Sequence, residues 1–328
     1  MNDWPILHNL WRRHCAPNTR SDSNNGSGSS PGTPSAAAHD NPPSNLEAEL
    51  RALQKMTIYM PVALRFLIEQ RPSAEGFRAW LLEQQQGYQI PKDAASALSD
   101  QHELTATQRQ FWDENGYLVL KAAIPKPYCQ AALQAVLDCL DARLDDPTSW
   151  YQPHPLRSGL MLQFSNHPAL NAIRESAHIR HAYETLYGSR ALYKTIDQVS
   201  FNPPESPNHR FMGSPLHWDV SLAQPIPQRF QGLLYLSDCG PNDGAFHCVP
   251  GFQRRVKDWL ASLPPGADPR QEAVQRLQAQ PVVGEAGDFV IWHQALPHCA
   301  TPNHGALPRL VQYLSYVPED YHAQETWI

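Results

Sequence analysis

The second half of the chain consists of short apolar segments with a period of two, separated by glycine, proline and asparagine residues. From about Ala191 onward, this period replaces the helical spacing of the first half. Alternating apolar and polar residues are typical of strands, and many short strands after a helical region favour a sandwich or a barrel. The candidate strands are 191–202, 215–221, 230–237, 245–249, 281–284, 288–293, 297–301 and 309–317. A helical insertion is expected around Arg254–Gln278.

Helices are predicted ahead of this region. Thr105 and Gln108 match a capping box, so we expect a helix that begins there and ends before Gly116. A strand over residues 117–120 and a helix over Lys126–Leu144 should follow. These elements lead into the strand-rich region.

A second capping box, Ser44-Asn45-Leu46-Glu47, predicts an earlier helical region. Its first helix would end near Pro61, with one apolar face made of Leu46, Leu50, Leu53 and Met60. Two more helices would follow, one to about Glu69 and one over Ala74–Gln86. We interpret their apolar stripes as packing faces, and we assign residues 46–103 to a helical extension.

The first 45 residues differ in composition from the rest of the chain. Half of residues 16–45 are Ser, Pro or Gly, so this segment buries too little apolar surface to order itself, and we predict a disordered linker. Residues 1–15 form an amphipathic segment with helix-like spacing of Trp4, Ile6, Leu7, Leu10 and Trp11. We interpret residues 1–15 as a candidate docking segment for a protein partner. The alternatives are a frayed tail, a short helix packed on the body, and an organellar transit peptide.

Charge and composition argue against several classes of protein. The chain has 26 Lys+Arg against 32 Asp+Glu, a net charge of −6, whereas proteins with a nucleic-acid partner usually carry a basic face. Its longest apolar runs fall far short of the ~20 residues of a membrane span, and no basic stretch followed by an apolar run marks a secretory signal. Because its cysteines form no Cys-x-x-Cys pair, we expect reduced thiols and a cytoplasmic location.

Metal-ligand chemistry is indicated by a single His-x-Asp motif, His217 and Asp219. Residues two apart on a strand point to one face, so both side chains could reach one metal ion. The motif alone is weak evidence, since about one is expected by chance in a chain with this many His and Asp residues. The late strands add His293, His298 and Arg309. One His-x-Asp pair with a distant His makes the facial triad of non-haem Fe(II) oxygenases.

Such a triad leaves metal positions for a cosubstrate. Two open positions suit a bidentate 2-oxo acid, and a third suits O₂. A buried arginine offers a planar fork that pairs with the far carboxylate of that acid. Arg309 is the candidate for this role, because it follows the late histidines on the next predicted strand.

A series of short motifs runs from about Leu104 to Tyr316, about two thirds of the chain. In chain order they are Leu104-Thr105 through Phe111, Glu114-Asn115-Gly116-Tyr117-Leu118-Val119-Leu120, His217-Trp218-Asp219, Asn242-Asp243-Gly244, Val249-Pro250-Gly251, Gly287-Asp288-Phe289-Val290-Ile291-Trp292-His293, Leu296-Pro297-His298, Pro302-Asn303, Arg309 and Tyr313. In their order and spacing, they resemble the phytanoyl-CoA dioxygenase family of Fe(II)/2-oxoglutarate-dependent oxygenases. No single motif decides the resemblance.

The resemblance implies a mostly β core, a double-stranded β-helix (jelly roll, cupin-like) flanked by α-helices, over residues 104–328. The helical N-terminal extension would precede this domain. The family's cofactors are Fe(II), 2-oxoglutarate as cosubstrate, and O₂. By the family pattern, His217, Asp219 and His298 would be the catalytic metal ligands.

The resemblance also implies roles for neighbouring residues. Arg309 would bind the far carboxylate of 2-oxoglutarate, and Gln198 and Asn202 would line the cosubstrate pocket. An alternative for the latter two is that they are ordinary polar residues of a barrel wall. His293, which ends the preceding strand, would pack near the metal site without binding the ion.

The family relationship implies hydroxylation of an unactivated C–H bond of a small-molecule substrate, with release of succinate and CO₂. Asp219 supports hydroxylation, because halogenating relatives carry a small residue in place of this carboxylate. The alternatives are an oxygenase that acts on a protein or peptide partner, and an inactive jelly-roll protein that binds a metal or ligand. We expect substrate contacts from segments 203–215, 220–231 and 254–280. The sequence predicts neither the substrate nor the oligomeric state.

Overall fold

The computed structural model of the chain describes residues 3–16 and 45–328. The linker predicted over residues 16–45 therefore lies outside the described residues, apart from its two end positions. The chain divides into two compact units, Met1–Gly87 and Tyr88–Ile328. Each unit has its own hydrophobic core.

The boundary between the units lies earlier than residue 103, where the helical extension was expected to end. The main-chain carbonyl of Gln89 accepts a hydrogen bond from Asn171 Nδ2 at 2.9 Å. The carbonyl of Leu98 accepts one from the amide of Ala177, also at 2.9 Å. These bonds connect the end of the expected extension to the second unit.

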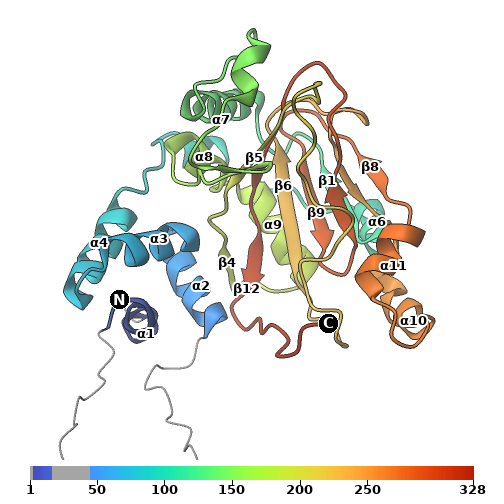
Figure 1. The fold of residues 1–328 in the computed structure, drawn as a ribbon, viewed down its shortest axis with the longest axis horizontal. Helices are drawn as coiled ribbons and strands as arrows, with labels where there is room; N and C mark the ends of the chain where they lie inside the picture. Colours follow the sequence, from blue (N-terminus) through green and yellow to red (C-terminus); the bar gives the residue numbers. More distant parts are fainter. Residues whose placement is uncertain (1–2, 17–44) are drawn as a thin grey trace, which may run out of the picture. The chain divides into compact units, whose positions relative to one another are not determined.

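The first unit is helical in its described part (Figure 1), with helices α1 (Trp4–Cys15), α2 (Leu46–Lys55), α3 (Met60–Gln70) and α4 (Ala74–Gln86). Leu7 and Leu10 of α1 are fully buried in one core with side chains of the other three helices. The indole N–H of Trp11 donates to the carbonyl oxygen of Pro72 at 2.8 Å. The apolar side of α1 thus lies against its own unit, and partner docking by residues 1–15 stays a prediction.

The predicted stripe from Leu46 to Met60 is wrong in two respects. Leu46 is 62 % exposed, and Met60 begins α3 instead of ending α2. Helix α2 ends at Lys55, and Thr57, with φ 62°, lies in the turn that follows it. Pro61 lies in the first turn of α3, a position that suits proline. The side chain of Asn45 caps α2.

The second unit has a β core flanked by helices (Figure 1). Its helical elements are α5 (Ala94–Ala97), α6 (Ala106–Asn115), α7 (Lys126–Cys139), the 3₁₀ turn η1 (Pro147–Tyr151), α8 (Pro168–Ile173), α9 (Ala177–Tyr187), the 3₁₀ turn η2 (Phe252–Arg254), α10 (Val256–Ala261) and α11 (Pro269–Arg276). Its strands are β1 (Tyr117–Leu120), β2 (Arg157–Ser158), β3 (Met161–Leu162), β4 (Leu192–Lys194), β5 (Val199–Asn202), β6 (Phe230–Tyr235), β7 (Phe246–Cys248), β8 (Gln280–Val282), β9 (Phe289–His293), β10 (His298–Ala300), β11 (Arg309–Tyr313) and β12 (Tyr316–Pro318). No helix in the described residues combines the length and hydropathy that a membrane span requires.

The strands form one large and one small sheet that face each other, plus the pair β12–β4. The large sheet has the order β1-β9-β6-β11-β5-β3-β2, and the small one has the order β10-β7-β8. Every pairing of these strands is antiparallel. The expectation of a mostly β, jelly-roll core flanked by α-helices is confirmed.

The two faces of the large sheet bury different cores, as the period of two requires. Leu234 of β6 and Ile291 of β9 belong to a core that includes residues of α7, α8 and α9. Their neighbours Leu233 and Val290 belong to a core shared with the small sheet. The inner face of the large sheet is therefore the face that can carry a site between the two sheets.

The predicted capping box is confirmed at α6. Thr105 accepts from the Gln108 amide, and the Gln108 side chain accepts from the amide of Thr105. Gly116 ends the helix with φ 72°, a left-handed conformation that glycine adopts without steric cost. Strand β1 follows over the predicted residues.

Helix α7 ends at Cys139, before the predicted Leu144. Asp141 adopts φ 51°, and the amide of Ala142 donates to the carbonyl of Leu137 at 2.9 Å. Such a turn satisfies the last carbonyls of a helix. Because aspartate takes the position that glycine usually occupies, the sequence carries no clear stop signal.

Several strand predictions need correction. Segments 191–202 and 309–317 each contain two separate strands. The predicted strand 215–221 is wrong, since its main-chain pairing with the sheets in the described structure is one isolated bridge between His217 and His298. This bridge determines the geometry of the predicted metal site.

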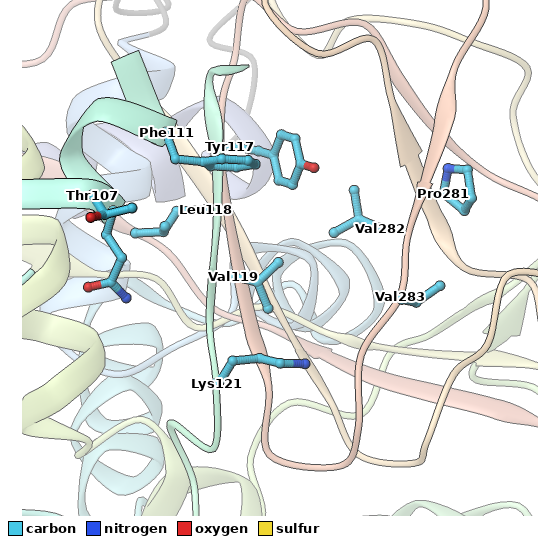
Figure 2. Close-up of a pocket in the computed structure, with 10 residues that line it drawn as sticks. Thr107, Phe111, Tyr117, Leu118, Val119, Lys121, Pro281, Val282 and Val283 are labelled. Carbon is cyan, nitrogen blue, oxygen red and sulfur yellow. The ribbon is translucent and has the colours of Figure 1, made fainter. Parts of the chain in front are cut away.

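A cleft of about 400 Å³ opens between β1 and β8 (Figure 2), the strands at the ends of the two sheets. Phe111 of α6, Tyr117 and Val119 of β1, and Val282 of β8 are among its lining residues. The residues predicted to bind the metal or the cosubstrate are not part of this lining.

Candidate metal centre

Two predicted ligands, His217 and His298, lie directly opposite each other. The amide of His217 donates to the carbonyl of His298 at 3.0 Å, and the amide of His298 donates back at 2.9 Å. Directly opposed residues of an antiparallel pair point to the same face, and the imidazole centroids are 4.7 Å apart. This reciprocal pair of hydrogen bonds brings the two imidazoles to the same face, although residues 215–221 form no strand.

The third predicted ligand, Asp219, projects its carboxylate toward both rings. Its Oδ1 lies 3.5 Å from His217 Nε2, and its Oδ2 lies 3.2 Å from His298 Nε2. One donor atom from each residue lies within 4.8 Å of the others. Two imidazole nitrogens and one carboxylate oxygen at this spacing fit a divalent transition metal such as Fe(II).

Each histidine is oriented through its other ring nitrogen. His217 Nδ1 lies 2.7 Å from the carbonyl oxygen of Pro215, and His298 Nδ1 lies 3.1 Å from that of Leu296. Because a carbonyl oxygen can only accept, Nδ1 carries the proton in both rings. The lone pair of each Nε2 is left for a metal ion, an arrangement typical of metal-binding histidines.

Charge within the cluster favours ionised Asp219. Burial raises the pKa of this carboxyl, but hydrogen bonds with His217 and His298 outweigh that effect and hold its pKa far below the ordinary value. Burial lowers the pKa of His217, yet the hydrogen bond and charge of Asp219 raise it to a net value above the ordinary one. In the absence of a metal ion, the negative charge of Asp219 therefore favours protonation of His217, at a position where a metal cation would fit.

Access to the cluster differs between its members. The side chain of His298 is 6 % exposed, whereas that of Asp219 is 51 % exposed. Trp292 and Phe246 pack around His298, with ring centroids 5.3 and 5.7 Å away. The site is therefore apolar on the His298 side and open to solvent on the Asp219 side.

Gln231 is a site residue that the sequence did not single out. Its Nε2 donates to Asp219 Oδ2 at 2.8 Å. It lies on β6 in the same alternation as Leu233, whose side chain faces the inner core. The alternation along β6 could have predicted that Gln231 lies on the inner face of the sheet. Its contact with Asp219 depends on the tertiary fold and has no local signal in the sequence.

Arg309, the predicted anchor, is buried and incompletely paired. It is 2 % exposed at the start of β11, and its Nη2 donates to Ser200 Oγ at 3.0 Å. Its Nε is buried without a hydrogen-bond partner, and in the described part of the chain no carboxylate lies within ion-pair distance. A buried guanidinium without a counter-charge is costly, so the position fits an anionic ligand.

Ser200 and Tyr313 lie beside this anchor, and neither was assigned a role from the sequence. Ser200 bonds Arg309 and shares a hydrogen bond with the Tyr313 hydroxyl. Burial raises the pKa of Tyr313, while the charge of Arg309 lowers it and that of Asp219 raises it. The phenol therefore lies within electrostatic range of the anchor and of the metal cluster, and its burial keeps it protonated.

The two predicted pocket residues, Gln198 and Asn202, lie beside and at the end of β5, the strand that pairs with the strand of Arg309. Asn202 is opposite Arg309 in the β5–β11 register, and its side-chain amide donates to the carbonyl of Thr301 at 3.1 Å. Gln198 precedes β5, and its main-chain carbonyl accepts from the Tyr313 amide at 3.3 Å. A cosubstrate contact by either side chain stays a prediction.

His293 lies outside the cluster, as expected. Its Nδ1 accepts a hydrogen bond from the Ala295 amide at 3.0 Å. Burial lowers its pKa to about 4. At neutral pH this imidazole is uncharged and supports the turn that leads to His298.

Comparison with known proteins agrees with this geometry. The family model described as phytanoyl-CoA dioxygenase (PhyH) matches residues 112–311, more than half of the chain. The chain belongs to the phytanoyl-CoA dioxygenase family. A Dictyostelium discoideum protein named "Putative phytanoyl-CoA dioxygenase" is 19 % identical over an alignment 262 residues long. The match covers 64 % of this chain and 74 % of that protein.

Solved structures with a similar fold include a protein from Streptomyces viridochromogenes and one from nogalamycin biosynthesis. AviO1 from Streptomyces viridochromogenes has a TM-score of 0.49 at 17 % identity, covering 68 % of this chain and 100 % of that one. SnoK, a non-haem alpha-ketoglutarate-dependent carbocyclase of nogalamycin biosynthesis, has a TM-score of 0.49 at 18 % identity, covering 66 % and 86 %. Because these scores lie below 0.5, the family assignment rests on the family model.

Family membership and the donor set together support Fe(II) and 2-oxoglutarate as the cofactors of this chain. The ligand types fit the metal, and the guanidinium of Arg309, whose Nε has no hydrogen-bond partner, fits the far carboxylate of the cosubstrate. The chain is thus an oxygenase or a closely related enzyme of this family.

Proposed function

We propose that this protein is an Fe(II)- and 2-oxoglutarate-dependent oxygenase that hydroxylates an unactivated C–H bond of a small-molecule metabolite. His217, Asp219 and His298 would hold the metal, and Arg309 would bind the far carboxylate of 2-oxoglutarate. The observation that carries the proposal is the occurrence of a candidate metal-binding triad together with a buried arginine that has no carboxylate partner among the residues the structure describes. An inactive jelly roll has no need for this second feature.

When bound, Fe(II) and 2-oxoglutarate supply the oxidation that uses O₂ and yields succinate and CO₂. The chain's own residues orient the reactants and limit the access of water. Gln231 holds one oxygen of Asp219, so the carboxylate keeps a fixed direction. Ser200 fixes the Arg309 fork at the other end of the cosubstrate site. Trp292 and Phe246 form an apolar wall beside His298.

Hydroxylation is favoured over halogenation because the Asp219 carboxylate is present and aimed at both histidines. The exposed side of the cluster lies at Asp219, so a substrate would approach from there. In segment 220–231, Ser221 and Gln224 donate to main-chain carbonyls. Substrate selection by segments 203–215, 220–231 and 254–280 remains part of the proposal.

The test is O₂-dependent conversion of 2-oxoglutarate to succinate, screened against a panel of small metabolites. We expect at least one metabolite to stimulate succinate formation and to gain one oxygen atom by mass spectrometry. Asp219→Ala and Arg309→Ala should each reduce the rate by more than about a hundredfold, because ligand and anchor losses exceed the effect of supporting residues. His304→Ala, a change at an exposed histidine outside the cluster, is the matched control. Succinate formation by Asp219→Ala at the wild-type rate would contradict the proposal.

A further inference from the structure

Arg270 lies in the first turn of α11, within the predicted helical insertion. The side chain of Asp268 caps this helix by accepting from the Arg270 amide at 2.8 Å, and Pro269 occupies its first turn. Ala273, three residues after Arg270, is fully buried in the inner core. Residues three apart share one helix face, so Arg270 projects from the inward face of α11.

The Arg270 guanidinium bonds the two residues that flank Asp219. Its Nη1 donates to the carbonyl of Trp218 and its Nη2 donates to the carbonyl of Val220, each at 2.8 Å. Residues 218–220 belong to no strand, so these carbonyls lack the partners that a sheet would provide. The two-pronged contact replaces a neighbouring strand and fixes the backbone on both sides of Asp219.

The end of the described chain holds Arg270 in turn. Nη2 also donates to the main-chain oxygen of Ile328 at 3.0 Å, and the guanidinium carbon lies 5.0 Å from the centroid of the Trp327 ring. Ser221 Oγ donates to the carbonyl of Thr326 at 2.7 Å and accepts from the Ile328 amide at 3.0 Å. Residues 326–328 therefore run beside the segment that follows Asp219.

We propose that Arg270 is a positioning residue of the metal centre, which sets the direction of the Asp219 carboxylate by clamping the main chain before and after it. This inference rests on the proposed function, since it takes Asp219 as a metal ligand. Asp219 Oδ2 accepts from Gln231 Nε2 and lies 3.2 Å from His298 Nε2, whereas the hydrogen bonds of Arg270 go to main-chain oxygens, two of them on the residues that flank Asp219. Arg270 of the insertion, together with residues 326–328, thereby supports Asp219, which lies outside the strands of both sheets.

The fork of the guanidinium is the feature to test, because lysine keeps the charge but cannot donate to two carbonyls in a fixed plane. Full-length wild type, Arg270→Ala and Arg270→Lys would be titrated with Co(II), a spectroscopic substitute for Fe(II). Visible absorption bands report the coordination geometry, and the titration gives the dissociation constant. Arg276→Ala is the control, since Arg276 lies on the same helix and pairs with Glu272 at 2.7 Å.

We expect both Arg270 variants to bind Co(II) about ten- to a hundredfold more weakly, the usual effect of losing support behind a metal ligand. Their visible bands should also shift, which a general loss of stability would not cause in the folded fraction. Arg276→Ala should match wild type in both measurements. If Arg270→Ala does not fold, the folded lysine variant decides the question.

The outcomes separate this inference from the proposed function. Wild type that binds no Co(II) would contradict the metal site, and with it both proposals. Wild type that binds Co(II), together with an Arg270→Lys variant of unchanged affinity and spectrum, would overturn the positioning role alone. A shifted spectrum and weakened binding in the lysine variant would support it.

Discussion

At the scale of single residues, the metal centre depends on side chains that restrict other side chains. Both histidines use Nδ1 to bond a carbonyl two residues earlier, so their rings are oriented before a metal binds. Gln231, on β6, donates a hydrogen bond to the Asp219 carboxylate. Orientation in advance lowers the cost of assembling the ligand set.

Replacing Gln231 by leucine tests this support. The change removes the hydrogen bond to Asp219 Oδ2 and lets the carboxylate rotate, so we expect metal affinity to fall about ten- to a hundredfold. Isothermal titration of the metal-free protein with Co(II) measures the effect. Gln110→Leu, on the exposed face of α6, should bind like wild type. Equal affinity of the Gln231 variant and wild type would show that the carboxylate needs no support.

His293 gives a pH prediction whose sign follows from burial. Its pKa is about 4 in the folded chain against 6.5 for the free side chain, so the unfolded chain takes up a proton first. The contribution to stability is complete above pH 6.5 and is lost as the pH falls toward 4, up to about 3 kcal/mol. Urea unfolding at several pH values, with a chelator present, should show this loss in wild type. His293→Gln should reduce the slope, and an unchanged slope would refute the assignment.

At the scale of elements, helix α9 approaches the large sheet at a glycine. A Cβ at Gly232 of β6 would lie 2.4 Å from the Tyr183 hydroxyl of α9 and 2.6 Å from the Leu314 carbonyl oxygen. The absence of a side chain there lets the helix pack closely on the strand. Because β6 also carries Gln231, this contact places the strand that supports Asp219.

Gly232→Ala should therefore destabilise the protein. Backbone atoms cannot move aside easily, so we expect a loss of about 1–3 kcal/mol, the usual cost of overpacking. Thermal unfolding followed by circular dichroism measures it. Gly76→Ala in α4 is the matched control, because its added Cβ would make only ordinary contacts at 3.4 Å. Equal melting temperatures of the two variants would contradict this packing account.

Helix α1 offers a second prediction at this scale. Leu10 is fully buried among the helices of the first unit, whereas Leu46 of α2 is exposed. Leu10→Ala should cost about 2–5 kcal/mol of stability, and Leu46→Ala should change it by less than about 0.5 kcal/mol. Denaturant unfolding monitored by tryptophan fluorescence compares them. A Leu10 variant as stable as the Leu46 variant would indicate that α1 does not pack in this core.

At the scale of the whole molecule, sequence patterns predicted the order of the elements and the three residues of the triad. They did not predict the contacts that support the triad. His217, Asp219 and His298 were selected because a facial triad needs particular residue types, and Arg309 because a 2-oxo acid needs a cation. The structure brings the three triad residues together, and their roles stay predictions. Gln231 and Arg270 were missed, because each reaches Asp219 from a distant segment and no local pattern records such a contact. The helix predicted to end near Pro61 is divided into α2 and α3, and the strand predicted over 215–221 is reduced to the bridge at His217.

The most direct test of the central claim is an anaerobic titration of the metal-free full chain with Fe(II) and then with 2-oxoglutarate. Chelation of a 2-oxo acid to Fe(II) produces a weak visible charge-transfer band. The account predicts that the band appears in wild type, is lost in His217→Ala, and needs a much higher 2-oxoglutarate concentration in Arg309→Ala. Folded wild-type protein that shows no band would contradict the assignment of His217, Asp219, His298 and Arg309 as a metal and cosubstrate site.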